Sequence, residues 1–295
     1  MYIFIKINQK IVKRKIYTIP FNIYFKMKSK SKSDYNKKSE DDFSDFIKKL
    51  ELQAIETAEE RIPLYLEVGL KDANMILDVG CGSGMVTRDI AHLTKGKVIA
   101  IDDSKDMIKV ARNVLKPYKN VELRVGNAEK IPFDDNTFDI VTCNLLLMWA
   151  KKPQKVVNEM ARVIKPGGIV LATLEPDYGG KLHYPEHTRV DPIFAGKAIK
   201  KKGGDPHIGR KLRLLFVRAG LITKVGIGNN RIWSCTEDRD YYFHARDFYV
   251  KALKDAGLSQ DEIDKWEYDY LRSLDEGVQL NFFPQFYAIG KKPEA

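Results

Sequence analysis

The sequence predicts an α/β protein with a doubly wound, mostly parallel seven-stranded sheet and a helical insertion before the last strand. Three observations support this prediction. Short apolar runs alternate with segments whose apolar residues recur at helical spacing, which is typical of a parallel sheet covered on both faces. The first apolar run ends in a glycine-rich turn, residues 80–84, of sequence GCGSG. Pro166-Gly167-Gly168 then separates a helical segment from the fifth apolar run, where such a triplet is expected to stop the helix.

Composition and charge narrow the class of protein. The 295 residues are 44% hydrophobic and 31% charged, which is typical of a globular chain. Residues 1–38 hold eleven Lys or Arg and one acid, whereas the other residues hold equal numbers of basic and acidic side chains. The net charge of +10 is therefore local, and it does not by itself predict nucleic-acid binding. We interpret residues 1–42 as a basic, flexible tail, with Met27 as an alternative start of translation, and residues 43–295 as the folded domain.

Neither a membrane span nor a disulfide framework is expected. No apolar run is long enough to cross a bilayer. The three cysteines, Cys81, Cys143 and Cys235, form no C-x-x-C pair, so we expect no metal site and a reducing, cytoplasmic setting.

The elements can be placed in order along the domain. A helix is expected over residues 43–60, where apolar residues recur at helical spacing. Ser104 is expected to cap the helix after the second strand, Pro153 to start the helix after the fourth, and Asp205-Pro206 to start the helix after the fifth. The expected strands are Met75–Val79, Val98–Ile101, Val121–Val125, Phe138–Cys143, Ile169–Leu174, Leu221–Ile227 and Phe286–Gly290.

An aromatic insertion, about residues 236–278, precedes the last expected strand. Its aromatic residues recur at helical spacing, and packing into a core is the default interpretation. A lid over an apolar or cationic substrate is the alternative. The residues are Tyr241, Tyr242, Phe243, Phe248, Tyr249, Trp266, Tyr268 and Tyr270.

The glycine-rich turn predicts a ligand site at the carboxyl end of the first strand. Gly80, Gly82 and Gly84 allow the backbone to turn tightly and to lie close against a ligand. A dinucleotide fold requires G-x-G-x-x-G, and Met85 follows Gly84 directly, so the spacing does not predict NAD binding. No lysine follows to make a phosphate-binding P-loop.

Polar residues follow the next strands at the same edge. A carboxylate at Asp102 can accept hydrogen bonds from ribose hydroxyls, although an acid there can also begin a helix. Asn127, in the stretch Gly126–Glu129, can contact an adenine edge or close an Asx turn. Asn144 ends the fourth strand, where the loops converge.

The segments LDVGCGSG, VIAIDDS, VGNAEKIPFDDNTFDIV and RVIKPGGIV together resemble the class I S-adenosylmethionine-dependent methyltransferases, of the type called methyltransferase domain 11/25. The resemblance covers about Ile76–Leu174. It implies a Rossmann-like methyltransferase fold, a cofactor-binding core at residues 74–175, and S-adenosyl-L-methionine as cofactor. It implies that Gly80, Gly82 and Gly84 lie against the methionine and ribose parts of this cofactor, with Asp78 in support.

The same resemblance implies ribose binding by Asp102 and adenine contacts by Asp103 and Met107. Asn127 stands where many members have Asp, so an altered adenine contact is expected there. Ala128 and Asn144 complete the expected cofactor set.

Candidate catalytic residues follow the fifth strand. Glu175, Asp177 and Tyr178 lie on the ligand edge, and His183 is a natural base near neutral pH. A turn built on Pro176 and two glycines is the structural alternative. The stretch EPDYGG, with GDPHIGR further on, also resembles an uncharacterised subgroup of the family with an E-P-D-[WY]-G-G turn.

We therefore predict a methyltransferase (EC 2.1.1.-) that acts on a small-molecule or lipid-like acceptor. The basic tail leaves RNA or a protein as the alternative acceptor, and a non-catalytic cofactor-binding protein is the third possibility. The absence of an [ND]-P-P-[YF] motif after the fourth strand disfavours methylation of nucleic-acid amino groups. The sequence leaves the oligomeric state open.

Overall fold

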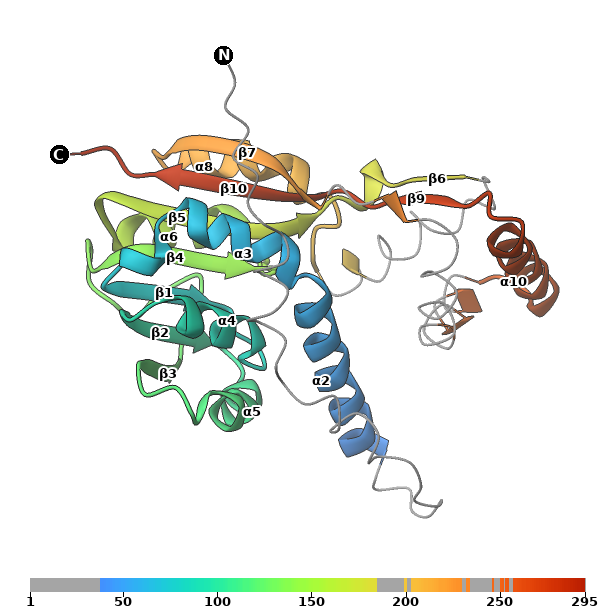
Figure 1. Cartoon of the computed structure of the whole chain (residues 1–295), viewed down its shortest axis with the longest axis horizontal. Coiled ribbons are helices and arrows are strands. Elements are labelled where there is room, and N and C mark those ends of the chain that lie inside the picture. The colour runs from blue at the N-terminus through green and yellow to red at the C-terminus, as the bar shows by residue number, and fades with distance from the viewer. Residues whose placement is uncertain are drawn as a thin grey trace, which may run out of the picture. The chain divides into compact units, whose positions relative to one another are not determined.

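The computed structural model describes residues 38–184, 199–200, 203–229, 232–233, 246, 250–251, 253–254 and 257–294. Seven strands within Phe46–Ala295 form one sheet in the order β3-β2-β1-β4-β5-β10-β7 (Figure 1). These strands are β1 (Met75–Val79), β2 (Lys97–Asp102), β3 (Val121–Val125), β4 (Phe138–Asn144), β5 (Ile164–Pro176), β7 (Ile222–Asn229) and β10 (Gln285–Lys291). All seven predicted strands are thus present in the described residues.

The sheet is mixed in direction. The five strands from β3 to β5 pair in parallel, whereas β10 runs antiparallel to both of its neighbours, β5 and β7. The strand β5 begins at Ile164, earlier than predicted, because Ile164 already pairs with Phe138 of β4. The register then shifts, and Gly167 at φ 76° takes part in a bulge within the strand. The expected helix stop at Pro166-Gly167-Gly168 is therefore part of a strand.

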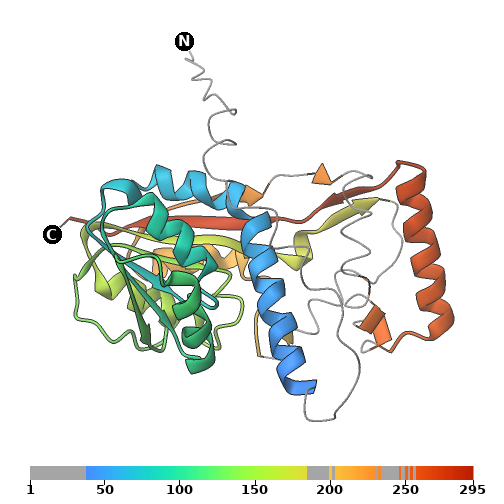
Figure 2. The same ribbon diagram turned by 60° about the horizontal axis from the view of Figure 1, so that its bottom comes forward.

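Helices cover both faces of the sheet. Figures 1 and 2 show α3 lying across one face, where it contacts α4, β5 and β7, and α5 packs on β2 and β3. On the other face α6 packs on β4 and β5, and α8 packs on β7 and β10. The bounds are α2 (Lys38–Glu56), α3 (Ala58–Glu67), η2 (Leu70–Asp72), α4 (Met85–Leu93), α5 (Lys105–Leu115), α6 (Pro153–Val163), η4 (Gly209–Lys211) and α8 (Leu212–Arg218).

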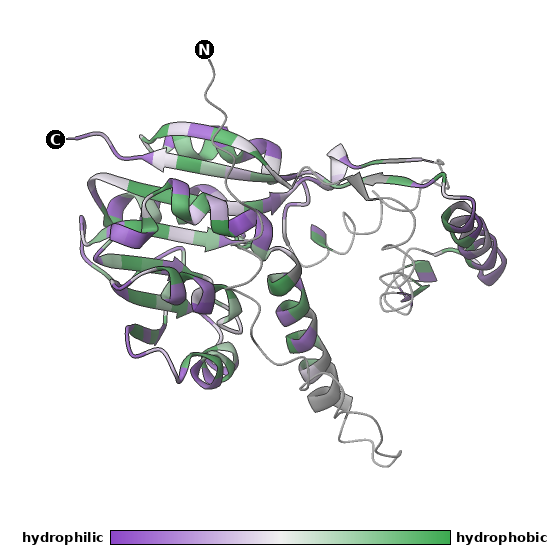
Figure 3. Cartoon of the chain, in the orientation of Figure 1, coloured by the Kyte–Doolittle hydropathy of each residue, from purple (hydrophilic) through white to green (hydrophobic). Residues whose placement is uncertain are grey.

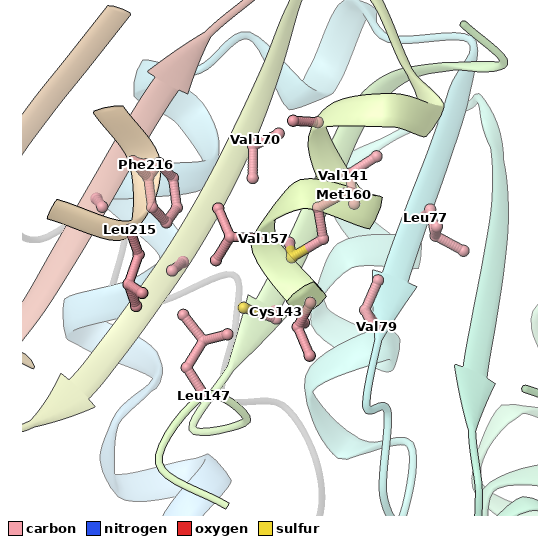
Figure 4. Close-up of a cluster of buried hydrophobic side chains, with 14 of the residues drawn as sticks. Leu77, Val79, Val141, Cys143, Leu147, Val157, Met160, Val170, Leu215 and Phe216 are labelled. Atoms are coloured by element: carbon pink, nitrogen blue, oxygen red, sulfur yellow. The ribbon is translucent and has the colours of Figure 1, made fainter. Parts of the chain in front are cut away.

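The strands bury apolar side chains on both faces of the sheet, and for this reason their sequences are nearly continuous apolar runs. Figure 3 shows hydrophobic residues concentrated along β1, β2 and β4. The larger core cluster lies between the sheet and the helices α6 and α8 (Figure 4). It includes Leu77, Val79, Val141, Cys143, Leu147, Val157, Met160, Val170, Leu215 and Phe216. None of the described helices has the length and apolar character needed to cross a bilayer.

Two of the three predicted helix starts are confirmed. The hydroxyl of Ser104 accepts the Met107 N–H at 3.2 Å, and Pro153 is the first residue of α6. The third prediction is wrong, because α8 begins at Leu212. The Asp205 carboxylate instead accepts the His207 N–H at 3.0 Å and closes a short turn.

A second, three-stranded sheet was not predicted. Its order is β6-β9-β8, with β6 (Leu182–Tyr184), β9 (Leu280–Phe282) and β8 (Ile232–Trp233). The first of these strands, β6, follows the 3-10 turn η3 (Tyr178–Gly180), which comes directly after β5.

The helix α10 (Gln260–Asp275) lies in the predicted insertion and begins with a capping box at Ser259. Trp266 is buried and stacks on Tyr270 with ring centroids 5.5 Å apart, as core packing requires, whereas Tyr268 is exposed. The predicted aromatic residues Tyr241, Tyr242, Phe243, Phe248 and Tyr249 lie outside the described residues, as does the tail before Lys38. The helix α2 begins at Lys38, earlier than the predicted start at 43.

Candidate functional site

The glycine loop connects β1 to α4. Gly80, Gly82 and Gly84 all have positive φ, at 76°, 50° and 84°, which side chains with a Cβ rarely adopt. The N–H groups of Gly80 and Cys81 both donate to the Ile101 carbonyl of β2, at 2.8 and 3.0 Å. A Cβ on Gly80 would lie 2.7 Å from Leu146 Cδ1, whereas a Cβ on Gly82 would meet nothing within 4 Å. The loop is therefore packed tightly at Gly80 and open at Gly82, which fits a ligand that lies against its backbone.

The Asp102 carboxylate holds the loop at the end of β2. Its Oδ2 accepts the Gly82 N–H at 2.9 Å, and its Oδ1 accepts the Ser104 N–H at 2.9 Å. Burial raises the pKa of Asp102, and these two hydrogen bonds oppose that rise. Since an ionised carboxylate offers about four acceptor positions, about two remain for a ligand.

Asp78 lies beneath the loop and is fully buried. Its Oδ2 accepts the Thr87 hydroxyl of α4 at 2.6 Å. Burial raises the pKa of Asp78 to about 6, against the hydrogen bond from Thr87 and the charge of the buried Arg61. Asp78 thus links β1 to α4 through its hydrogen bond with Thr87.

The residues expected around the adenine ring differ in exposure. Asp103 is exposed, and Met107 is buried in the first turn of α5. Asn127 is exposed, and its Oδ1 accepts the Glu129 N–H at 2.7 Å, so it closes the Asx turn that was the alternative interpretation. Its amide nitrogen is the polar group that a purine edge could use. Ala128 is half-buried against the larger core cluster.

The turn after β4 brings Asn144 and Glu175 together with the loop. Asn144 Oδ1 accepts the Thr173 hydroxyl of β5 at 2.8 Å. Leu145, at φ 52°, and Leu174, at φ 55°, both adopt the left-handed region, which is unusual for residues with a Cβ. Such strained positions often cluster at functional sites.

Glu175 is fully buried and serves as an acceptor for this turn. Its Oε1 accepts the N–H groups of Leu146 and Leu147, both at 2.9 Å, and its Oε2 accepts the Met148 N–H at 3.2 Å. Burial raises the pKa of Glu175 to about 7, although the three N–H donors favour the charged form. This geometry favours a role in holding the turn rather than proton transfer with an acceptor.

The pH dependence of stability follows from this pKa. The folded pKa of Glu175, about 7, exceeds its ordinary value of 4.5, so within that window the folded chain holds a proton that the unfolded chain releases. The free energy of unfolding should therefore fall as the pH rises through the window. Urea unfolding at about pH 5 and about pH 8 measures this fall, and Glu175→Gln should reduce it. An identical fall in the variant would contradict the prediction.

Asp177 joins the turn after β5 to residues 205–211. Its Oδ2 accepts Arg210 Nε at 2.5 Å, and its Oδ1 accepts Arg210 Nη2 at 2.9 Å and contacts His207 Nδ1 at 3.2 Å. Burial opposes ionisation of Asp177, but the hydrogen bonds from Arg210 and His207 outweigh it and hold its pKa below the ordinary value. His207 and Arg210 were absent from the predicted site, and no local sequence signal connects them to Asp177.

The last two predicted catalytic residues are Tyr178 and His183. The Tyr178 ring lies 4.7 Å from the Phe283 ring, and its N–H donates to the Pro206 carbonyl at 3.0 Å. His183 lies in β6, where its backbone pairs with Asn281, and its side chain lies outside the described part of the structure. The structure thus gathers Glu175, Asp177 and Tyr178 at the end of β5.

A cavity of about 330 Å³ lies beside this edge of the sheet, between α3 and the end of β7. Two acids and one tyrosine contribute its polar lining. The lining residues are Glu59, Glu60, Pro63, Leu64, Ile227, Gly228 and Tyr287. The glycine loop does not line it, so this cavity is separate from the loop.

The fold and the loop define a class of protein. A glycine loop after the first strand and a carboxylate after the second, at the carboxyl edge of a parallel sheet, are typical of nucleotide-binding α/β proteins. The comparison with protein families identifies a member of this class. A family model described as a methyltransferase domain matches residues 77–172.

Relatives and solved structures agree with this match. An uncharacterized methyltransferase of Schizosaccharomyces pombe is 28% identical over 224 residues, which cover 69% of this chain and 80% of the relative. A demethylmenaquinone methyltransferase of Bacillus licheniformis is 38% identical over 162 residues, which cover 52% of this chain and 70% of the relative. The crystal structure of a putative methyltransferase from Bacillus halodurans superposes with a TM-score of 0.53 at 22% identity, covering 79% of this chain and 98% of the other. The chain belongs to the class I S-adenosylmethionine-dependent methyltransferases.

Proposed function

We propose that this methyltransferase transfers the methyl group of S-adenosylmethionine to a small, lipophilic acceptor of the quinol type. The observation that carries the proposal is the 38% identity with the Bacillus licheniformis enzyme, whose name gives demethylmenaquinone as its substrate. The chain's match covers 70% of that enzyme. We also assign the E-P-D-Y-G-G turn to the uncharacterised subgroup that has this motif.

We propose that the glycine loop and Asp102 hold the cofactor. S-adenosylmethionine, when bound, supplies a methyl group already activated by a sulfonium. The protein then has to bind the cofactor and the acceptor, orient them relative to each other, and exclude water from between them. Open backbone at Gly82 suits close approach of the ligand, and the free acceptor positions of Asp102 suit ribose hydroxyls. Asp103, Met107, Asn127 and Ala128 would surround the adenine, and Asn144 would border the methionine side.

Replacing Asp102 with alanine should weaken binding of S-adenosylhomocysteine by about 1–3 kcal/mol, because a charge-assisted acceptor and the anchor of Gly82 are both lost. Isothermal titration calorimetry measures this change. Asp106→Ala, which removes an exposed acid from the first turn of α5, is the matched control and should leave affinity unchanged. Equal affinities for wild type and Asp102→Ala would show that Asp102 does not contact the cofactor.

Methyl-label transfer tests the proposed acceptor. Purified protein is incubated with methyl-labelled S-adenosylmethionine and either reduced naphthoquinones or a cell extract. The proposal expects label in the organic-solvent fraction and in the naphthohydroquinone. Label confined to an acid precipitate that RNase or protease releases would instead identify a macromolecular acceptor, and the proposed acceptor class would be wrong.

A further inference from the structure

The turn after β5 contains an Asp–His pair arranged as in enzymes that remove a proton. His207 Nδ1 lies 3.2 Å from Asp177 Oδ1. The carboxylate is almost fully buried, whereas the imidazole side chain is 36% exposed. Because the pKa of Asp177 is held below its ordinary value, this carboxylate is ionised and can only accept. Nδ1 therefore donates in this hydrogen bond, and in the neutral imidazole Nε2 then carries the lone pair.

The position of the pair is built by its neighbours. Arg210 binds both oxygens of Asp177 and fixes the orientation of the carboxylate. Gly179 leaves the space that the ring occupies, since a Cβ there would lie 2.8 Å from His207 Nδ1 and Cε1. Asp205 accepts the His207 N–H at 3.0 Å and fixes the backbone. Asp177 and Asp205 thus both accept from His207, and their cationic partners are Arg210 and Lys211.

The pair lies at the edge where methyl transfer is expected. Asp177 follows β5 directly, and the Asp205 N–H donates to the Met148 carbonyl, in the turn after β4, at 2.8 Å. That turn also contains Leu146, which packs over Gly80 of the glycine loop. A group held here therefore lies on the same edge as the loop.

We infer that His207, oriented by Asp177, accepts the proton of the acceptor's hydroxyl group during methyl transfer. The inference rests on the proposed function, because a quinol-type acceptor becomes a stronger nucleophile when its hydroxyl loses a proton. The hydroxyl proton moves to Nε2, and the electron pair left on oxygen drives attack on the methyl carbon. The methyl–sulfur bond breaks, and its electron pair stays on sulfur. Where the new bond forms at a ring carbon, that carbon then loses its own hydrogen as a proton to water, which restores the aromatic ring, and Nε2 returns its proton to the oxygen.

The decisive variant is His207→Asn, whose amide can still donate to Asp177 but has no basic nitrogen. We expect kcat with 1,4-naphthohydroquinone to fall by about 100-fold or more, while KM and S-adenosylhomocysteine affinity change by less than about threefold. Lys211→Gln is the matched control, since it removes an exposed ion pair with Asp205 in the same segment and leaves Asp177, Arg210 and His207 in place. We expect its kcat to stay within about threefold of wild type. A kcat for Lys211→Gln as low as that of His207→Asn would mean that the segment is only a structural latch and would overturn the inference, as would a kcat for His207→Asn within about threefold of wild type.

Acceptor acidity gives a second readout. A chlorinated naphthohydroquinone ionises more easily, so the defect of His207→Asn should shrink with it, whereas an equal defect with both acceptors would contradict the inference. If His207→Asn does not fold, diethyl pyrocarbonate is applied to wild type and the modified histidines are mapped by mass spectrometry. Loss of turnover that follows His207 modification, with S-adenosylhomocysteine binding kept, supports the inference, and full modification with activity kept overturns it.

The two proposals fail separately. If wild type methylates no naphthohydroquinone, the acceptor class is wrong, and the His207 comparison is made with the acceptor that the cell-extract experiment identifies. If wild type is active and His207→Asn is equally active, only the inference about His207 fails.

Discussion

Replacing Gly80 with alanine is expected to lower the affinity for S-adenosylhomocysteine by about tenfold to a hundredfold. Two costs combine at this position. The φ angle of 76° lies in the left-handed region, which costs a residue with a Cβ about 1–2 kcal/mol. The added methyl group would also lie 2.7 Å from Leu146 Cδ1, so the Leu146 side chain, or the loop that it packs on, must shift. Because the free loop can relieve this strain by moving, the ligand has to restore the native loop, and the backbone cost then adds to the cost of displacing Leu146 in the binding free energy. At about 1.4 kcal/mol per tenfold, the two together give the expected loss, which calorimetry measures.

Gly69 offers a matched control for the backbone cost. Its φ angle is 73°, nearly that of Gly80, but a Cβ there would meet nothing within 4 Å. Gly69→Ala should reduce the free energy of unfolding by about 1–2 kcal/mol and leave ligand affinity unchanged. If both variants bind S-adenosylhomocysteine as tightly as wild type, the glycine loop is not the cofactor site.

Glu175→Ala is expected to reduce the free energy of unfolding by about 3 kcal/mol or more. The variant leaves the N–H groups of Leu146, Leu147 and Met148 without their acceptor, and Leu147 and Met148 are buried. A buried donor without a partner costs about 1–3 kcal/mol. Urea unfolding, followed by circular dichroism, measures the difference.

Glu67→Ala is the control for this second variant. The Glu67 side chain is 44% exposed and pairs with Lys224 at 2.5 Å on the surface. Such exposed pairs contribute about 0–1 kcal/mol, so a small change is expected. A comparably small loss in Glu175→Ala would show that the turn after β4 does not depend on the buried carboxylate.

The sequence predicts those features of the structure that depend on residues close together in the chain. Each strand of the large sheet is a buried apolar run, and Ser104 and Pro153 mark helix starts through contacts within one turn. The glycine loop was found for the same reason, because the glycine spacing and the preceding strand lie within ten residues or so of each other. These features need no knowledge of distant partners.

The remaining features depend on distant contacts. Asp177 meets His207 and Arg210, 30 and 33 residues away, so its turn could not be assigned a chemical role from its own residues. The sequence predicts Glu175 as a candidate base. In the structure its carboxylate accepts hydrogen bonds from N–H groups 27 to 29 residues earlier in the chain, and no pattern around Glu175 indicates these partners. The small sheet escaped prediction because its strands have three, three and two residues, which is too short for a period to show.

The place of β10 has a consequence for how the chain is made. This strand lies between β5 and β7, yet it follows both in chain order. While the ribosome is still translating the residues before Gln285, β5 presents an open edge and β7 has no neighbour to pair with. The nascent chain can assemble β1 to β5 but cannot complete the sheet until Gln285–Lys291 emerge. Ribosome stalling shortly before this strand should therefore yield a protease-sensitive intermediate with an exposed strand edge, a natural substrate for a holdase chaperone.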